Sequence, residues 1–228
     1  AAGVVGSAFS FNGTNGYIQI PDLAVLKPTN LTVEAWVNFS GLDSARSGTA
    51  PAGDQYIVFK QNSRANSFEG YSLEKYRVGN GDAFMFTVGS VSGQEVVLLS
   101  KTLISTSVWY HVAAVRGTNF TELYVNGQLE GRTNVAFAQD YGSYPLYFGT
   151  SGETYWDGKL RGLLDEVSLY NRALSSNEIA AVYAAGSAGK CKAPGITTQP
   201  RSQEVEVGTS ALFTVTASGA GPLGYRWQ

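Results

Sequence analysis

The chain has 228 residues, 43% of them hydrophobic, and a formal net charge of −2. That small charge and the lack of a Lys/Arg cluster argue against nucleic acid as a partner. The sequence has no run of about 18 apolar residues, so it does not predict a membrane-spanning segment. A single cysteine, Cys191, excludes an internal disulfide, while 27 glycines and 13 tyrosines are typical of a turn-rich β protein.

Short segments in which apolar and polar residues alternate recur along the chain, as expected of β-strands. A polar segment at 40–55 interrupts them, and Asn126-Gly127 is a strong hairpin signal. This pattern predicts an all-β fold, a two-sheet antiparallel jelly-roll sandwich. The predicted strands are Ala8–Phe11, Tyr17–Ile20, Leu31–Phe39, Tyr56–Gln61, Tyr71–Tyr76, Ala83–Val88, Glu95–Ser100, Trp109–Arg116, Thr121–Val125, Leu146–Gly149 and Leu163–Tyr170.

The segment from Leu160 to Gly186 combines the last of these strands with a capped helix. Ser175 and Glu178 have the spacing of a capping box, in which each side chain satisfies a free backbone N–H group of the other. Gly186 stands where a helix commonly ends in a residue with positive φ. In the preceding strand, alternation places four side chains on one face, namely Leu164, Glu166, Ser168 and Tyr170.

We expect a first domain at 1–186, a linker at 187–195 and a second, truncated domain at 196–228. The last segment resembles the first third of a bacterial immunoglobulin-like domain, with Trp227 in the place of the core tryptophan and no cysteine on the preceding strand. Its apolar residues need cover. We expect the first domain, residues beyond the segment or a neighbouring chain, as in a domain-swapped dimer, to supply it.

Six blocks of the sequence stand out for their aromatic and glycine pattern: AFSFNGTNGY (8–17), LTVEAWV (31–37), WYHVA (109–113), LYVNG (123–127), PLYFG (145–149) and LDEVSLYNRAL (164–174). In this order they resemble the concanavalin A-like or laminin-G-like (LamG) jelly-roll domains, and the resemblance covers Ala8 to Tyr183. It implies the sandwich fold and says less about function, because one fold serves many functions.

The resemblance also implies a structural Ca²⁺ at the edge of the sandwich. Carried over to this chain, its ligands are Asn12, Asn15 or Gly16 and Asp165. Asn12 and Gly16 replace the acidic residues that are frequent in the family, which predicts weaker binding. The alternative is that Asn12-Gly13 forms a simple turn and that Asp165 accepts hydrogen bonds from backbone N–H groups.

Aromatic residues in two glycine-rich segments suggest a ligand site, because sugar rings stack on Tyr and Trp side chains. Asp157 would bind hydroxyl groups beside them. The alternative is that these residues cover the sandwich edge or pack on the 40–55 segment. The candidate ligand-binding residues are Tyr141, Tyr144, Tyr155, Trp156 and Asp157.

The sequence offers no catalytic constellation. His111, the only histidine, shares a strand face with Ala113 and Val115, and we interpret it as a packed, hydrogen-bonded residue. The Glu-x-Asp-x-x-Glu strand of the related glucanases is missing, and the adjacent Asp165 and Glu166 point to opposite faces. We therefore expect a protein that is not an enzyme.

The leading hypothesis is a non-catalytic recognition or adhesion module of a larger secreted or cell-surface bacterial protein, with a glycan or an extracellular protein as partner. Its N-terminal segment lacks the basic region of a signal peptide, so we expect any export signal to have been removed. The alternatives are a structural spacer, suggested by the immunoglobulin-like segment, and a polysaccharide-active enzyme of the same fold.

Overall fold

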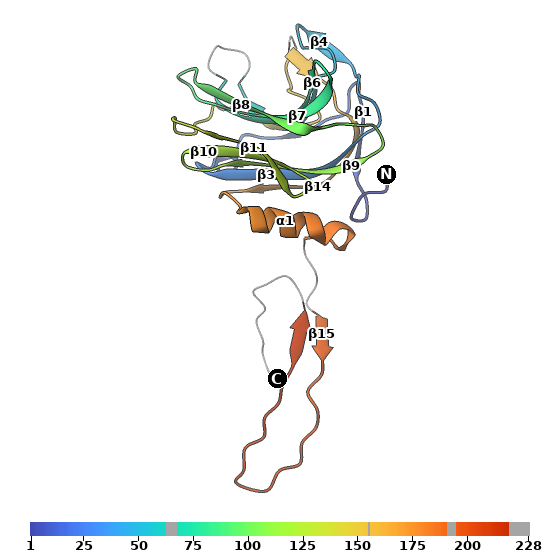
Figure 1. The fold of residues 1–228 in the computed structure, drawn as a ribbon, viewed down its shortest axis with the longest axis vertical. Coiled ribbons are helices and arrows are strands. Elements are labelled where there is room, and N and C mark those ends of the chain that lie inside the picture. Colours follow the sequence, from blue (N-terminus) through green and yellow to red (C-terminus); the bar gives the residue numbers. More distant parts are fainter. Residues whose placement is uncertain (63–67, 155, 191–194, 219–228) are drawn as a thin grey trace.

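The computed structural model describes residues 1–62, 68–154, 156–190 and 195–218. Two six-stranded sheets stack face to face, and α1 lies across the outer face of one of them (Figure 1). Each neighbouring strand pair in these sheets is antiparallel. The predicted jelly-roll sandwich with one short helix is confirmed.

The first sheet has the strand order β1-β14-β3-β9-β10-β11. Two of the predicted strands, β3 and β9, have the expected bounds. Strand β11 follows the predicted turn, where Asn126 and Gly127 have φ of 49° and 75°. The strands are β1 (Phe9–Asn12), β3 (Leu31–Phe39), β9 (Trp109–Arg116), β10 (Phe120–Val125), β11 (Gln128–Asn134) and β14 (Arg161–Tyr170).

The second sheet has the order β2-β12-β5-β6-β7-β8. Its strands match predicted segments, and several extend beyond them. They are β2 (Ile18–Ile20), β5 (Gln55–Gln61), β6 (Gly70–Val78), β7 (Gly81–Gly89), β8 (Glu95–Leu103) and β12 (Leu146–Phe148).

Short elements complete the fold. Strands β4 (Arg46–Gly48) and β13 (Trp156–Gly158) pair into a small ladder, although both segments lie in regions predicted as loops. None of the helices in the described ranges is long and apolar enough to cross a membrane. The other elements are α1 (Ser176–Ala185), the 3₁₀ turns η1 (Ala24–Leu26) and η2 (Gly186–Ala188), and the tail strands β15 (Gly195–Thr198) and β16 (Thr216–Ser218).

Strand β3 explains how α1 is held. Its inward residues, including Val37 and Phe39, are fully buried between the sheets. Its outward Trp36 stacks on Tyr183 of α1, with ring centroids 5.6 Å apart. The helix begins with the predicted capping box, in which Ser175 and Glu178 bond reciprocally. Alternation with apolar residues on both faces therefore marks a strand covered by a sheet on one side and a helix on the other.

The predicted alternation along β14 is wrong beyond Asp165. The register against β3 shifts between Asp165 and Ser168, and Glu166 adopts a positive φ of 50°. This β-bulge inserts an extra residue and reverses the faces. Leu164 packs in the core between the sheets, whereas Tyr170 packs on the opposite face, near α1.

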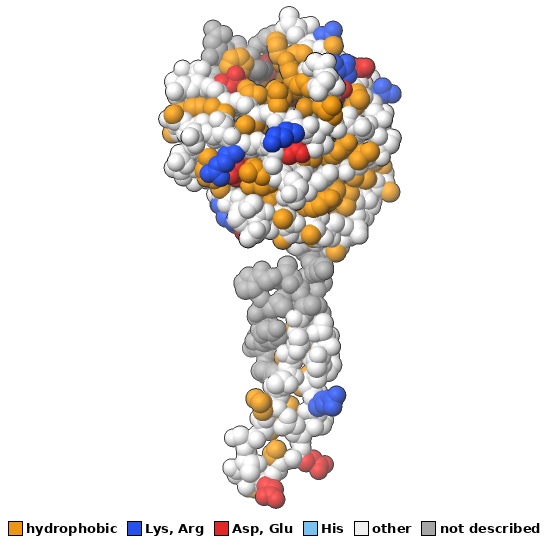
Figure 2. Space-filling view, in the orientation of Figure 1, with side chains coloured by type: hydrophobic (Ala, Val, Ile, Leu, Met, Phe, Trp, Pro, Cys, Tyr) orange, Lys and Arg blue, Asp and Glu red, His pale blue; other side chains and the backbone are white. Residues whose placement is uncertain are grey.

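The tail does not pack on the sandwich over its described residues. Ile196 is 56% exposed and Phe213 is 47% exposed, and apolar side chains are scattered along the surface of the tail (Figure 2). The expectation that the first domain covers them is therefore wrong. Cover by a neighbouring chain, or by residues beyond the segment, stays a prediction. Cys191 and Trp227 lie outside the described residues.

Candidate functional site

The last residue of β1 and the loop after it hold three of the predicted calcium ligands in a self-contained turn. Asn12 Oδ1 accepts hydrogen bonds from the backbone nitrogens of Thr14, Asn15 and Gly16 at 2.9–3.1 Å. The Asn12 amide donates to Asn15 Oδ1 at 2.7 Å. The side-chain oxygens that would bind a cation are already engaged in the turn.

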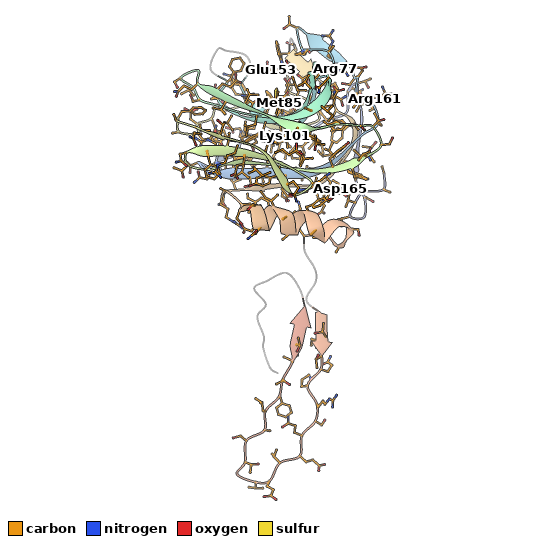
Figure 3. All side chains as sticks on the ribbon, viewed as in Figure 1. Arg77, Met85, Lys101, Glu153, Arg161 and Asp165 are labelled. Atoms are coloured by element: carbon orange, nitrogen blue, oxygen red, sulfur yellow. The ribbon has the colours of Figure 1, made fainter. Side chains whose placement is uncertain are left out.

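Asp165, the fourth predicted ligand, lies elsewhere. In the register of β1 on β14, Asn12 is opposite Arg161, four positions from Asp165 and so about 13 Å away along the strand. Figure 3 shows Arg161 towards the β4 end of the sandwich and Asp165 near α1. Asp165 is buried and accepts from the backbone nitrogens of Val5 and Glu166, each at 2.9 Å.

The prediction of one calcium site built from these four residues is therefore wrong, because strand register separates them. Both alternatives considered for them are what the structure shows: a turn, and a carboxylate that accepts backbone N–H groups. Across the described ranges, no three His, Cys, Asp or Glu side chains form a group that could hold a metal ion. The predicted donor set does not fit a bound calcium ion.

Two of the predicted ligand-binding residues are occupied by internal contacts. Asp157 is buried, accepts from Thr150 Oγ1 at 2.9 Å and the Ser151 backbone nitrogen at 2.8 Å, and pairs with Lys159 at 2.5 Å. The Tyr141 hydroxyl donates to the Pro28 carbonyl at 2.8 Å. Both side chains therefore hold loops in place, as in the alternative considered for them, and their role in ligand binding stays a prediction.

The other three candidates have different outcomes. Tyr144 is half-buried, and its carbonyl accepts a hydrogen bond from Lys60 Nζ at 2.7 Å. Tyr155 lies outside the described residues. Trp156 is half-buried in β13, and its indole N–H donates to the Tyr56 hydroxyl. Of the predicted set, Trp156 therefore leads to the wider arrangement of aromatic residues below.

The outer face of the second sheet carries an aromatic row that runs Tyr17, Tyr147, Phe59, Tyr56 and Trp156. The rings of Tyr17 and Tyr147 lie 6.3 Å apart in an edge contact, and those of Tyr56 and Phe59 lie 4.9 Å apart. Tyr147 is opposite Phe59 in the β12–β5 register. The row starts at Tyr17, directly before β2, crosses β12 and β5, and reaches β13.

The two ends of the aromatic row reach solvent, whereas its middle does not. Tyr17 is 52% exposed, and Tyr147 and Trp156 are half-buried, but Phe59 and Tyr56 are almost fully covered. Polar groups surround the open Tyr17 end. Exposed Gln19 is opposite Tyr147 in the register of β2 on β12. The Lys159 ammonium lies 5.6 Å from the centre of the Tyr17 ring.

His111 has the packed role that the sequence predicted. It is fully buried under α1, and its Nε2 lies 2.6 Å from Glu34 Oε2. The same glutamate accepts from the Tyr170 hydroxyl at 3.1 Å and pairs with Lys190 at 2.8 Å. This network ties Lys190, in the chain that follows α1, to the first sheet.

The comparison with known protein families identifies the superfamily of this chain. A family profile described as the concanavalin A-like lectin/glucanases superfamily matches residues 12–180. The chain belongs to this superfamily. Comparison with curated protein sequences gives no match.

Several solved structures have a similar fold at low sequence identity. Domain 4 of AbnA, an extracellular GH43 arabinanase from Geobacillus stearothermophilus, in complex with arabinotriose, is 19% identical over 79% of this chain and 78% of that chain, with a TM-score of 0.57. A heptameric SAP-like pentraxin from Limulus polyphemus is 18% identical over 76% and 80%, with a TM-score of 0.54. The binding domain of Paraclostridial Mosquitocidal Protein 1 is 16% identical over 80% and 44%, with a TM-score of 0.59.

Because the superfamily includes glucanases, the spacing of paired carboxyl groups bears on catalysis. Glycosidases usually separate their two carboxyl groups by about 5 to 9.5 Å, which leaves room for the sugar or a water molecule. On the outer face of the second sheet, Asp54 and Glu74 form one pair of neighbouring carboxyl groups. These two side chains are buried and hydrogen-bonded to each other, so this pair lacks the spacing for glycosidic hydrolysis.

Sequence reasoning missed this carboxyl pair and the Tyr17 end of the aromatic row. Asp54 precedes β5 and Glu74 lies in β6, and only the pairing of Tyr56 with Glu74 brings them together. Tyr17 and Tyr147 are likewise joined by the pairing of β2 with β12. Strand alternation could have placed Glu74 and Tyr147 on an outer face, but the order of strands in the sheet was needed to place them beside their partners.

Proposed function

We propose that this domain is a non-catalytic recognition module of a secreted or cell-surface bacterial protein, and that it binds a glycan. The observation that carries the proposal is the aromatic row, whose Tyr17 end is open to solvent beside polar side chains. The proposal includes an extracellular location, where glycans of cell walls and surfaces are accessible.

The chemistry of the Tyr17 end suits a sugar. The C–H face of a pyranose or furanose ring stacks on an aromatic ring, and tyrosine adds a hydroxyl group that bonds to water or ligand. The Gln19 amide supplies both donors and an acceptor, and the Lys159 ammonium supplies donors. Lys159 is already paired with Asp157, so a neutral glycan is a better match than an acidic one.

The comparisons support the proposal by analogy. The arabinanase domain of similar fold is in complex with arabinotriose, and the mosquitocidal protein domain is a binding domain. Neither relative fixes the ligand of this chain, because the identities of 19% and 16% show the fold alone. The choice of a glycan rests on the exposed aromatic side chains and the polar groups around them.

A panel of neutral plant and bacterial oligosaccharides tests the proposal. Binding of the full chain is measured by isothermal titration for each hit, together with the variants Tyr17→Ala and Trp156→Ala. We expect each variant to weaken binding about tenfold, as for a contact residue worth more than 1 kcal/mol. Phe9→Ala is the matched control, because Phe9 is 58% exposed on β1 of the opposite sheet. Its affinity should equal that of the wild type.

Two results would overturn the glycan proposal: no binding across the panel, or equal losses in Tyr17→Ala and Phe9→Ala. A chelator arm tests the metal separately. Because the predicted calcium ligands do not form one site, we expect EDTA to change neither the affinity nor the melting temperature. A stabilising shift on adding Ca²⁺ would contradict this, since a cation that binds only the folded state raises its stability.

A spacer role is the second candidate, and the attachment of Lys190 favours it. Lys190, within the predicted linker at 187–195, donates to Ser168 Oγ at 2.6 Å and pairs with buried Glu34. The chain therefore leaves the sandwich from an anchored point. Small-angle scattering tests this role: Lys190→Met should broaden the distribution of end-to-end distances, and an unchanged distribution would argue against a rigid spacer.

A further inference from the structure

The buried carboxyl pair on the second sheet lies under the small β4–β13 ladder, defined as residues 46–48 and 156–158. Asp54 directly precedes β5, and Glu74 is opposite Tyr56 in the β5–β6 register. Asp54 and Glu74 are 2% and 3% exposed. Both carboxyl groups are therefore removed from water and from mobile counter-ions.

Counting donors shows that the pair needs a proton. Ser72 Oγ donates to Glu74 Oε1 at 3.1 Å. The Tyr56 hydroxyl hydrogen-bonds to the Asp54 carboxylate, but Asp54 Oδ1 is buried and receives no hydrogen bond from a donor of the described chain. Two ionised carboxylates can only accept hydrogen bonds. The hydrogen bond between the two side chains therefore requires that one of them, Glu74, carries a proton and donates it to Asp54.

The charged groups around the pair do not replace that proton. Lys75 forms an ion pair with Asp82, which also pairs with Arg77. Lys159 pairs with Asp157. The titratable groups that act on the pair are Tyr56, Lys75, Glu95 and Asp157. Arg46, Arg77, Asp82 and Lys159 lie on or next to the flanking strands β4, β6, β7 and β13. Asp157 and Glu95 make a second negative charge in the pair less favourable, and both lysines already have carboxylate partners.

We propose that Asp54 and Glu74 share one proton at neutral pH and that its loss releases the β4–β13 ladder from the second sheet. The inference goes beyond ligand binding and does not depend on it. Release of the ladder would, however, move Trp156, which lies in β13 at one end of the aromatic row.

The ladder is the part of the domain that would respond first. It has three residues in each strand and pairs with no other strand, and isolated two-stranded sheets are marginally stable. It touches the pair closely, because a Cβ atom built on Gly158 would lie 2.1 Å from the Asp54 carbonyl oxygen. Trp156 is joined to Tyr56, the residue opposite Glu74. Charge repulsion in the pair therefore acts directly beneath the ladder.

The direction of the pH response follows from burial. Burial raises the pKa of Asp54 to about 6 and that of Glu74 well above the usual range of a carboxyl group. In a released ladder, both groups would be solvated and would ionise near pH 4. The closed form therefore binds more protons than the open form, and rising pH favours opening by about tenfold per pH unit for each proton lost.

Amide hydrogen exchange of the full chain tests the proposal between pH 5 and pH 7, with rates expressed as protection factors that correct for intrinsic exchange. We expect protection at 46–48 and 156–158 to fall about tenfold per pH unit, while β9 in the opposite sheet keeps its protection. The isosteric variants Glu74→Gln and Asp54→Asn should flatten this dependence. Glu122→Gln is the control, since Glu122 is a buried carboxyl that bonds to Tyr124 and Arg132 in the first sheet.

Three other outcomes of this experiment would contradict the proposal. Protection at the ladder that is independent of pH would show that the pair loses no proton there. An unchanged pH dependence in both Glu74→Gln and Asp54→Asn would assign the proton to another group. Equal loss of protection in the ladder and β9 would mean global unfolding rather than local release. Because no ligand is present, these failures are separate from a failure of the glycan proposal.

Discussion

The outer faces of the two sheets each bury a glutamate, and the two residues have opposite surroundings. Glu34 of the first sheet, under α1, has three partners: His111, the Tyr170 hydroxyl and Lys190. Glu74 of the second sheet, under the β4–β13 ladder, contacts a serine and a second acid. Both side chains are at most 3% exposed, so burial does not distinguish them.

The neighbours decide the charge of each glutamate. Burial acts to raise the pKa of Glu34, but His111 and Lys190 outweigh it and leave that pKa lowered. Burial and Asp54 both raise the pKa of Glu74. The same side chain is therefore a fixed anion in one sheet and a proton carrier in the other. Under α1, the partners of Glu34 keep it ionised. Under the β4–β13 ladder, the protonation of Glu74 changes with pH.

The largest expected effect comes from breaking the Glu34 network. Glu34→Gln leaves Lys190 without its buried counter-charge, and breaking a buried ion pair costs about 3 to 5 kcal/mol. Urea unfolding at pH 7 measures the loss. Because the folded pKa of Glu34 is lowered, its contribution is present above about pH 4 and is lost as the pH falls. The gap between variant and wild type should narrow at acid pH. Glu204→Gln, on the exposed tail, should change nothing.

The contact between the ladder and Asp54 can be broken sterically. A Cβ atom on Gly158 would lie 2.1 Å from the Asp54 carbonyl oxygen, so Gly158→Ala must push β13 away from β5. We expect a loss of about 2 kcal/mol, within the usual range for overpacking. Gly79→Ala is the matched control, because its Cβ atom would meet no atom within 4 Å. Equal melting temperatures for the two variants would contradict the close packing of the ladder.

A smaller effect of opposite sign is expected for Asp54→Asn. The folded pKa of Asp54 is raised to about 6 by burial, so the wild type loses stability as the pH rises from about 4 to about 6 and remains less stable above it. Removing the charge should stabilise the protein at pH 8 by at least about 1.4 kcal/mol, the value of one pKa unit. Chemical unfolding at pH 4 and pH 8 measures it. Asp43→Asn, which removes an exposed partner of Arg77, should stay near the wild type at both pH values.

The elements of the sandwich were predictable from the sequence because alternation is a local property. Leu31–Phe39 and Trp109–Arg116 were predicted with the bounds that the structure shows. The three-residue strands β4 and β13 were not, since they are too short to show a period and pair across a long separation in sequence. The bulge at Glu166 was also hidden, because a non-glycine residue with positive φ leaves no sequence signal.

The candidate site depended on information that a sequence pattern lacks. Whether Asn12 meets Asp165, or Asp54 meets Glu74, is decided by strand order and register. A shift of a few residues turns a shared site into two separate ones, as happened with the predicted calcium ligands. Aromatic residues raised the same problem: Tyr141 and Trp156 come from similar loops, but one is fixed to Pro28 and the other borders the aromatic row.

The smallest expected effect, and the most local one, concerns the N-terminal cap of α1, the helix that covers the first sheet. Ser175 Oγ accepts from the Glu178 backbone nitrogen, and the Glu178 carboxylate accepts from the Ser175 nitrogen. Ser175→Ala removes half of this reciprocal pair and should cost about 1 kcal/mol, measured by thermal unfolding at pH 7. Ser176, one residue further along, takes no part in the capping box, so Ser176→Ala should leave the stability unchanged. If both variants lost the same stability, the serine-to-alanine change itself would be responsible, and the cover over Glu34 would not depend on the cap.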